Sequence, residues 1–382
     1  MKSNYDILGN HIRLIDTRNR ESITDRVLGI NIDKFFMPSV ANVIGTDLSK
    51  YKLITKGKFA CNPMHVGRDE RLPVALYTEE EPAIVSPAYF MFEVIDNSIL
   101  NEDYLMMWFR RPEFDRICWL HTDGSVRGGI TWDDICRLEL PIPPIENQLE
   151  IVNSYKAITE RITLKQKIND NLEATALTMF SDFVAQSNEE WEQNNLGDII
   201  ASANTGGDAI QKVPIVDYDT GIKCARVGDI TNAREYASWA FCNASDSVYE
   251  NYKLQTGDIL VTRTATLGIT QYIADDIPAV YNNGLIRLKF DTQKVLPLYV
   301  YWAINTSDFM NYINQMNSAT SVRPNMKIDY LLSYQLLIPP IELQTAFVNK
   351  AEAIRRAISL NNDEILKLIE FQTAILTTLS RR

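Results

Sequence analysis

The chain has 382 residues, of which 46% are apolar and 23% charged, and its formal net charge is −11. These proportions are typical of a folded globular protein, and the length suggests two or three domains. No apolar run is long enough for a transmembrane helix and the N-terminus does not read as a signal peptide, so we expect a cytoplasmic protein. The acidic residues are spread evenly, which argues against a protein that binds nucleic acid alone.

The sequence shows no pattern typical of a catalytic or metal site. The five cysteines form no Cys-x-x-Cys pair, and we interpret them as buried apolar residues rather than disulfides or ligands. The three histidines have no Cys or carboxylate at a spacing that indicates a metal. Neither a nucleotide-binding Gly-x-x-x-x-Gly-Lys-Ser/Thr loop nor a His-Glu-x-x-His helix is present. We therefore expect no catalytic residue, no metal and no cofactor bound by this chain.

The first 140 residues predict a mixed α+β head. A strand is expected at Gly57–Cys61 and is followed by the polar segment Asn62–Arg68. The stretch Ala83–Phe90 contains an apolar run, a small polar turn and the start of a second apolar run. A helix is expected from Tyr104 to Phe114.

Residues 141–187 predict a long helix that starts after Pro143-Pro144. Proline is tolerated at the first helical turn and cannot continue the strand that precedes it. The apolar residues then follow at alternating spacings of four and three, which is the pattern of a helix that packs on another helix. At about 1.5 Å per residue, forty residues would make a helix roughly 60 Å long.

The second half predicts the same series of elements. Strands are expected at Gly257–Arg263 and Gly268–Ile273, and a helix from Leu298 to Ile313. A second heptad helix is expected in residues 337–382, after Pro339-Pro340.

An internal repeat relates the two halves. Ser125–Arg127 and Leu140–Gln148 recur as Ser321–Arg323 and Leu336–Gln344, each after an interval of 196 residues. We therefore predict an α+β protein with a pseudo-two-fold repeat, in which two globular heads are joined by two long helices packed as an antiparallel coiled coil. The expected segments are a first head at 1–140, a central helical region at 141–187, a second head at 188–336 and a C-terminal helical region at 337–382.

The two heptad stripes identify the residues that we expect to pair the helices or to bind a partner subunit. Their polar members Lys165, Asn169, Asn361 and Gln372 would fix the register at some cost in stability. An alternative is that each helix packs only on its own head. The expected interface residues are Ile151, Tyr155, Ile158, Ile162, Leu172, Phe347, Ile354, Ile358, Ile365 and Leu368.

Polar residues near the expected strand ends are candidates for reading DNA bases, because a base edge needs paired donors or a donor beside an acceptor. The alternative is that they cap turns or pair with local acids. Arg127 and Arg323 are a separate case, since their repetition indicates either a phosphate contact or, as we favour, an anchor between head and helix. The remaining candidates are Lys58, Asn62, His65, Arg68, Arg71, Thr262, Arg263, Thr264, Thr266, Asn282 and Asn283.

The Ser-Val-Arg segment, the Ile-Pro-Pro-Ile-Glu-x-x-Gln box and the long helix that follows, each present twice, resemble the specificity subunit of type I restriction-modification systems. The resemblance covers the whole chain. It implies a non-enzymatic subunit whose heads are target recognition domains, each reading one part of a split, asymmetric site in double-stranded DNA. It also implies that the helices bind two modification (methyltransferase) subunits, through which restriction subunits join. S-adenosylmethionine, ATP and Mg would then belong to those partners.

Two functions of other classes stay open at the level of sequence. One is an autonomous DNA methyltransferase or nuclease with unrecognised catalytic residues. The other is a structural adaptor whose heads bind proteins, for which the negative charge is the main support.

Overall fold

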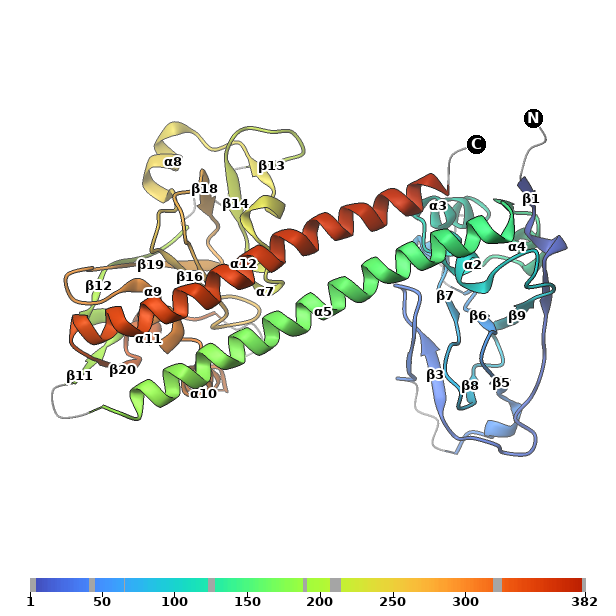
Figure 1. Cartoon of the computed structure of the whole chain (residues 1–382), viewed down its shortest axis with the longest axis horizontal. Coiled ribbons are helices and arrows are strands. Elements are labelled where there is room, and N and C mark those ends of the chain that lie inside the picture. The colour runs from blue at the N-terminus through green and yellow to red at the C-terminus, as the bar shows by residue number, and fades with distance from the viewer. Residues whose placement is uncertain are drawn as a thin grey trace. The chain divides into compact units, whose positions relative to one another are not determined.

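The computed structural model describes residues 5–40, 45–64, 66–122, 128–187, 191–206, 214–318 and 325–379. The chain divides into two compact units, and Figure 1 labels their elements. Unit 1 comprises Met1–Leu164 and Ile365–Arg382, and unit 2 comprises Lys165–Glu364. Each of the two long helices therefore contributes one part to each unit.

Unit 1 combines two four-stranded sheets, ordered β2-β9-β6-β7 and β4-β3-β8-β5, with the strand pair β1-β10. Its elements in chain order are β1 (Tyr5–Ile7), η1 (Leu8–Asn10), β2 (Ile12–Leu14), β3 (Val27–Ile30), β4 (Phe36–Pro38), η2 (Leu48–Lys50), β5 (Lys52–Ile54), β6 (Phe59–Cys61), α1 (Val66–Asp69), β7 (Val74–Leu76), β8 (Ala83–Val85), β9 (Phe90–Val94), α2 (Glu102–Phe109), α3 (Pro112–Leu120), α4 (Trp132–Cys136), β10 (Glu139–Pro141) and the first part of α5 (Ile145–Val184).

Unit 2 combines the sheets β12-β19-β16-β17 and β13-β15-β14-β18 with the strand pair β11-β20. Its elements after the second part of α5 are β11 (Glu192–Asn195), η3 (Leu196–Asp198), β12 (Ile200–Thr205), β13 (Ile215–Val216), β14 (Lys223–Ala225), α7 (Val227–Thr231), η4 (Tyr236–Ser238), β15 (Phe241–Cys242), α8 (Asp246–Tyr252), β16 (Ile259–Thr262), β17 (Thr270–Tyr272), β18 (Ala279–Tyr281), β19 (Leu285–Phe290), α9 (Pro297–Ala303), α10 (Ser307–Ser318), α11 (Ile328–Leu332), β20 (Gln335–Ile338) and most of α12 (Ile341–Thr378).

The two units share the topology of one sheet and the parallel strand pair of the other. The sheet β2-β9-β6-β7 has its counterpart in β12-β19-β16-β17, and the parallel pair β3–β8 has its counterpart in β14–β18. Strands β8 and β18 start at Ala83 and Ala279, which keeps the interval of 196 residues seen in the sequence. The predicted mixed α+β fold is confirmed.

One prediction about the helices was wrong. The stretches Tyr104–Phe114 and Leu298–Ile313 each form two helices rather than one. In unit 1, Pro112 opens α3, and the residue before it, Arg111, is extended with ψ of 141°. A residue that precedes proline is disfavoured in the helical conformation, so a helix cannot continue through this point.

The predicted helices after each Pro-Pro pair are confirmed, and α5 and α12 are 40 and 38 residues long. In unit 2 they run antiparallel (Figure 1): Lys165 Nζ donates to Asn361 Oδ1 at 2.9 Å, whereas the rings of Phe180 and Phe347 lie 5.4 Å apart. Residue numbers thus rise along α5 while they fall along α12.

Every residue of the two predicted stripes is buried or half-buried, including the ten expected interface residues. In unit 1, Gln372 of α12 donates to Thr159 Oγ1 of α5 at 2.6 Å. In unit 2, Asn169 donates to Asn362 and accepts from Asn361, both at 2.8 Å. The helices therefore pair in both units, and the alternative that each packs only on its own head is wrong.

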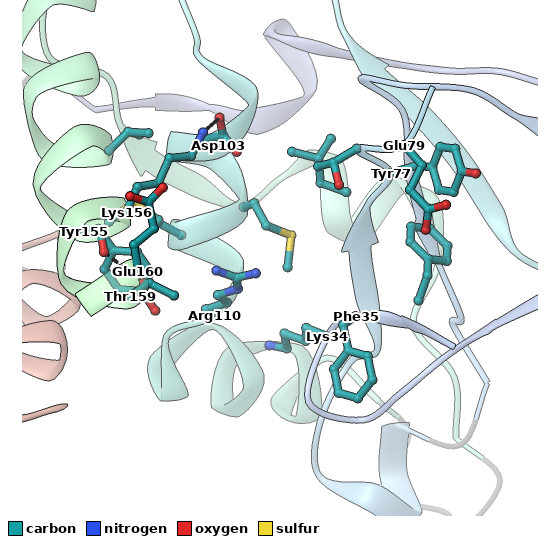
Figure 2. A pocket seen from close by; sticks show the side chains of 16 residues that line it. Lys34, Phe35, Tyr77, Glu79, Asp103, Arg110, Tyr155, Lys156, Thr159 and Glu160 are labelled. Carbon is teal, nitrogen blue, oxygen red and sulfur yellow. Dashed lines mark hydrogen bonds and ion pairs between the residues drawn. The ribbon is translucent and has the colours of Figure 1, made fainter. Parts of the chain in front are cut away.

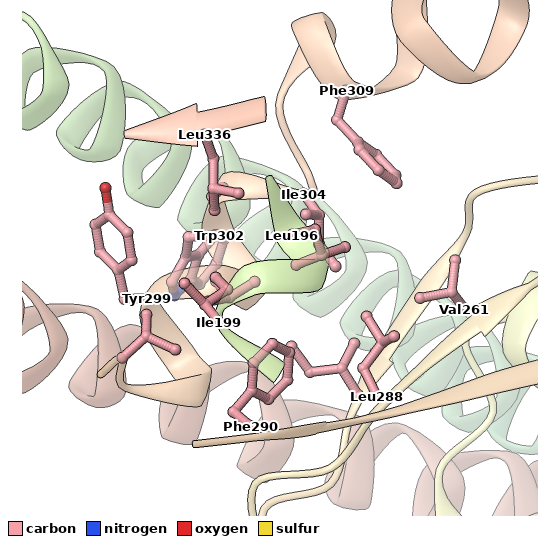
Figure 3. Packing of buried hydrophobic residues seen from close by; sticks show 14 of the residues in the cluster. Leu196, Ile199, Val261, Leu288, Phe290, Tyr299, Trp302, Ile304, Phe309 and Leu336 are labelled. Carbon is pink, nitrogen blue, oxygen red and sulfur yellow. The ribbon is translucent and has the colours of Figure 1, made fainter. Parts of the chain in front are cut away.

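Both helices also enter the hydrophobic cores. Val152 of α5 and Leu379, the residue after α12, belong to the core of unit 1. Ala176 and Phe180 of α5 and Phe347 of α12 belong to the core of unit 2. Figure 3 shows part of that second core, where residues from the strands, α9 and α10 meet.

A buried glutamine ties each head to its long helix. Gln148 of α5 accepts a hydrogen bond from Asn101 N at 2.9 Å and donates to the carbonyls of Ile99 and Pro143, each at 2.8 Å. Asn101 is the N-cap of α2, so the glutamine also satisfies a backbone group beside that helix.

Gln344 of α12 makes the equivalent contacts in unit 2. It accepts from Leu296 N at 2.8 Å and donates to the carbonyl of Pro339 at 2.8 Å and, more weakly, to that of Lys294 at 3.4 Å. This explains why the glutamine of the Pro-Pro-Ile-Glu-x-x-Gln box recurs.

All five cysteines are free, and four of them are buried while Cys136 is half-buried, which agrees with their interpretation as apolar residues. None of the helices in the described ranges combines the length and hydropathy that a membrane span requires.

Candidate nucleic-acid interface

In unit 2, polar loops gather where two parallel strands end. Strands β14 and β18 are parallel, so their last residues, Ala225 and Tyr281, lie at the same edge. The residues that follow are Arg226 and Asn282, and Asn282 N donates to Ala225 O at 3.0 Å. The segments that follow β14 and β18, which are far apart in the sequence, therefore lie side by side at this edge.

The loop after β16 adds a third segment to this edge. A Cβ on Gly284 would lie 2.4 Å from Cγ2 of Val227 and 2.9 Å from Oγ1 of Thr264, so both side chains contact the backbone at Gly284. Asn282 Oδ1 accepts from Gly284 N at 3.1 Å and shapes this turn. We call the polar residues gathered here the unit 2 loop cluster: Arg226, Arg263, Thr264, Asn282, Asn283 and Asn325.

Arg263 joins the loops of the cluster. Its guanidinium donates to Met326 O at 3.2 Å, to Asn325 Oδ1 at 2.9 Å, and to Asn283 through both the backbone and side-chain oxygens at 3.4 Å. Its backbone carbonyl accepts from Met326 N at 2.8 Å. The predicted base reader is thus half-buried and holds the loops that surround it.

Thr262 does not face solvent. It is fully buried, and its hydroxyl accepts from Ile269 N at 2.9 Å. A side chain without exposed surface cannot reach a base edge, so we no longer count Thr262 among the candidates. Thr264 is half-buried and Thr266 is exposed, in a tight loop where Ala265 has φ of +62°.

Unit 1 builds its corresponding loops around Pro63. The carbonyl of Pro63 accepts from Ile130 N at 3.2 Å, as that of Arg263 accepts from Met326 N in unit 2. A Cβ on Gly129 would lie 2.9 Å from this carbonyl, so the close approach requires a glycine. Asn62, the predicted base reader beside it, accepts from Met64 N at 3.1 Å through Oδ1.

The two charged candidates of unit 1 whose side chains are described are paired with acids, as the alternative interpretation expected. Lys58 pairs with Glu93, which also accepts from Arg13. Arg71 donates to Asp33 Oδ1 at 2.9 Å and keeps half of its side chain exposed. Pairing with the donating Lys58 lowers the pKa of Glu93.

Four candidates cannot be placed. His65, Arg127 and Arg323 lie outside the described residues, as do the Ser-Val-Arg segments, and for Arg68 only the backbone is described. The residues that follow the segments are placed: Gly128 O accepts from Gly67 N at 3.0 Å, and Met326 N donates to Arg263.

Sequence reasoning missed Arg226, Arg234 and Asn325. Arg226 follows directly after the buried strand β14, a position from which it could have been suspected. Asp229 is 1% exposed and binds both Arg226 and Arg234, which keep 39% and 51% of their side chains exposed. Nothing in the spacing of the sequence predicts that Asn325 meets Arg263.

Each unit also has a cavity beside its long helix. In unit 1 it has a volume of about 580 Å³, and Figure 2 shows Lys156 of α5 paired with Asp103 of α2 at its wall. In unit 2 a cavity of about 760 Å³ is lined by the equivalent segments, with Glu352 in place of Lys156. There Arg355 pairs with Glu352 at 2.8 Å and lies over the ring of Tyr272.

Within the described ranges, no group of three or more His, Cys, Asp or Glu side chains is arranged to hold a metal ion. The polar groups of the unit 2 loop cluster are amides, a hydroxyl and guanidiniums.

Comparison with known proteins finds a related family and related structures. Residues 188–370 match the family "Type I restriction modification DNA specificity domain". A search of curated proteins finds no significant match. The fold is similar to that of the "Type-I restriction-modification system S subunit from M. genitalium", with a TM-score of 0.58 and 14% identity over 98% of this chain and 95% of that one.

Two further structures align at lower similarity. One, from work on complex assembly and conformational transition of the type I system, has a TM-score of 0.45, 15% identity and coverages of 99% and 97%. The other, a specificity subunit from Thermoanaerobacter tengcongensis, has a TM-score of 0.37, 15% identity and coverages of 98% and 95%. Of these three structures, the M. genitalium subunit has a TM-score that shows a shared fold. Residues 188–370 thus match the DNA specificity domain of type I restriction-modification systems, and the chain over its length has a fold similar to that of a specificity subunit.

Proposed function

We propose that this chain reads a two-part, asymmetric site in double-stranded DNA, with one part read by each unit, and that it carries two modification subunits. The observation behind this proposal is the repeat: unit 2, which contains most of the matched specificity domain, shares the topology of one sheet and a parallel strand pair with unit 1. One recognition domain would lie in residues 1–140 and the other in 188–336, with helical regions at 141–187 and 337–382.

The loop clusters are the surfaces that we assign to DNA. They differ in side chains between the units, as two different half-sites require, while the backbone bonds that hold them recur. With the net charge of −11, the chain would need phosphate contacts from its partners, and we expect it to bind DNA weakly and salt-sensitively when alone.

We assign the outer faces of α5 and α12 to the modification subunits. Leu164 and Leu360 occupy equivalent positions, 196 residues apart, and keep 59% and 69% of their surface exposed on otherwise amphipathic helices. A single exposed leucine is common, but the same one in both copies suits two identical partners. Restriction subunits would join through these partners, which would also bind S-adenosylmethionine, ATP and Mg.

Native mass spectrometry of the chain co-expressed with its modification subunit tests this assignment. We expect one chain to bind two modification subunits, and Leu164→Glu or Leu360→Glu to reduce the number to one. Gln166→Glu, which adds the same charge at an exposed position of α5, should keep both. A wild-type chain that stays monomeric beside the modification subunit would contradict the proposal.

A further inference from the structure

A buried carboxylate holds an arginine at the edge of the unit 2 loop cluster. Asp229 Oδ2 accepts from the backbone N of Arg226 at 3.0 Å and from its Nε at 3.2 Å. Asp229 Oδ1 accepts from Arg234 at 3.3 Å. Because the carboxylate is 1% exposed, both contacts lie where water competes little.

This contact leaves one end of the Arg226 guanidinium available. Nε faces Asp229, and in the described part of the chain the two terminal nitrogens have no hydrogen-bond partner. The side chain is 39% exposed, so these nitrogens can meet a ligand from solvent. The side chain therefore presents two adjacent donors in an orientation that the protein fixes.

Arg226 lies among the residues that we assign to DNA. It directly follows Ala225, whose carbonyl accepts from Asn282 N at 3.0 Å. Its other neighbour, Val227, contacts the backbone at Gly284 beside Thr264. Both sequence neighbours of Arg226 therefore contact the segment that contains Asn282 and Gly284.

The charges favour a base rather than a phosphate as the ligand. A phosphate contact gains from net positive charge and needs little orientation, and Asp229 reduces that charge. Guanine presents O6 and N7 in the major groove, and two parallel donors of an arginine match them. A carboxylate that orients the guanidinium improves such a match while it weakens general attraction to DNA.

We infer that Arg226 is a specificity-determining residue that reads a guanine in the half-site of unit 2, and that Asp229 is its positioning residue. This inference rests on the proposed function, because it requires unit 2 to bind DNA.

Equilibrium binding by the assembled complex of this chain with its modification subunits tests the inference. The preferred site is first selected from random duplexes with the wild-type complex, and each base pair is then replaced in turn. Arg226→Ala should reduce discrimination at one G·C pair of one half-site by roughly 10- to 100-fold and leave the other positions unchanged.

Two conservative variants separate the roles. Arg226→Lys keeps the charge but not the paired donors, so it should lose the same discrimination with an unchanged salt dependence. Asp229→Asn should reduce discrimination at that same base pair while it raises affinity for unrelated DNA, because one negative charge is removed. Thermal unfolding of both variants confirms that the fold is kept.

Lys253→Ala is the matched control, because Lys253 is an ion-paired lysine of unit 2 outside the loop cluster. It should change discrimination at no position. If Arg226→Ala instead weakens binding to all sequences equally and lowers the salt dependence by about one ion, Arg226 contacts a phosphate and the inference is wrong. An unchanged preference also overturns it. A wild-type complex that selects no motif would defeat the proposed function itself.

Discussion

The loop clusters of the two units are held by the same backbone contact but carry different side chains. In both, a residue just beyond the end of β6 or β16 accepts a hydrogen bond through its carbonyl, from Ile130 in unit 1 and from Met326 in unit 2. In unit 1 that residue is Pro63, which has no polar side chain, whereas in unit 2 it is Arg263, which binds three neighbouring residues. This comparison indicates that the repeated backbone hydrogen bond determines the shape of the loops. The side chains on the loops can therefore differ between the units.

The two units also differ in the charge at one equivalent position of β9 and β19. Glu93 of β9 pairs with Lys58 and Arg13, while the residue 196 positions later, Lys289 of β19, donates to Gln255. The charge at this position is reversed between the units. At this position unit 1 therefore has an acid-sensitive contact, whereas unit 2 has none.

The largest effect should come from the shared glutamines. Gln148→Ala and Gln344→Ala each leave buried backbone groups without partners, so we expect either to lower the free energy of unfolding by about 2–4 kcal/mol. Thermal or urea unfolding measures this. Asn147→Ala, at the exposed neighbouring position, should change little. A loss below about 1 kcal/mol in either unit would contradict a shared role.

The two long helices carry different residues at one equivalent position of their contact stripes. Making these residues identical should lower the free energy of unfolding. Asn169 corresponds to Ile365, and it bonds to Asn361 and Asn362 in unit 2. Asn169→Ile makes the two positions alike but removes one hydrogen bond each from Asn361 Nδ2 and Asn362 Oδ1, so we expect a loss of about 1–2 kcal/mol in urea unfolding. A gain in stability would mean that the polar contacts serve only register, as they do in some coiled coils.

Substitutions in the loops of the two units should affect recognition of different DNA half-sites. Arg263→Ala releases the loops of unit 2, and Asn62→Ala removes a turn contact of unit 1. We expect the first to weaken recognition of one half-site by about 1 kcal/mol, the value of one net hydrogen bond, and the second to weaken the other half-site by less. Titration of the assembled complex with duplexes altered in either half measures both. Equal loss at both half-sites for Arg263→Ala would indicate a general defect of the fold.

The smallest effect is the pH dependence that Glu93 confers on unit 1. Its pKa is lowered in the folded state by the hydrogen bond from Lys58, so its contribution is present above the unfolded pKa and is lost as pH falls through the folded value. Glu93→Gln should cost up to about 1 kcal/mol at neutral pH and nothing below the folded pKa of Glu93.

The control for this prediction is Lys289→Gln, which removes the reversed charge in unit 2. A lysine stays protonated throughout acid titration, so this variant should follow the wild-type pH dependence of unfolding. If Glu93→Gln instead lowered the free energy of unfolding by the same amount at every pH, Glu93 would not be the source of the pH dependence.

Much of the fold could be predicted because it follows from local pattern. The heptad spacing in residues 145–184 and 341–378 identified both helices, and every residue that it placed in the stripes is buried or half-buried, although it missed the buried Val152 and Phe180. The interval of 196 residues matched β8 with β18. The break at Arg111 was missed, although Pro112 signals it, because the apolar residues on both sides read as one continuous pattern.

The loop clusters could be predicted only in part. Arg263, Asn282 and Asn283 were identified because they follow apolar runs, but Arg226 was not, since its position beside Asn282 depends on the parallel pairing of β14 with β18. Such pairing joins segments far apart in the chain, and local pattern does not encode it. The burial of Thr262 likewise depends on its bond to Ile269 across the loop.

The most direct test of the central claim is selection of binding sites from random duplexes by the complex of this chain with its modification subunits. We predict enrichment of a split motif, with two short specified parts separated by a fixed number of unspecified base pairs. Repeating the selection with Arg263→Ala should reduce the enrichment of one part and leave the other intact. No enriched motif, or one continuous motif that Arg263→Ala weakens throughout, would contradict the claim that each unit reads its own half-site.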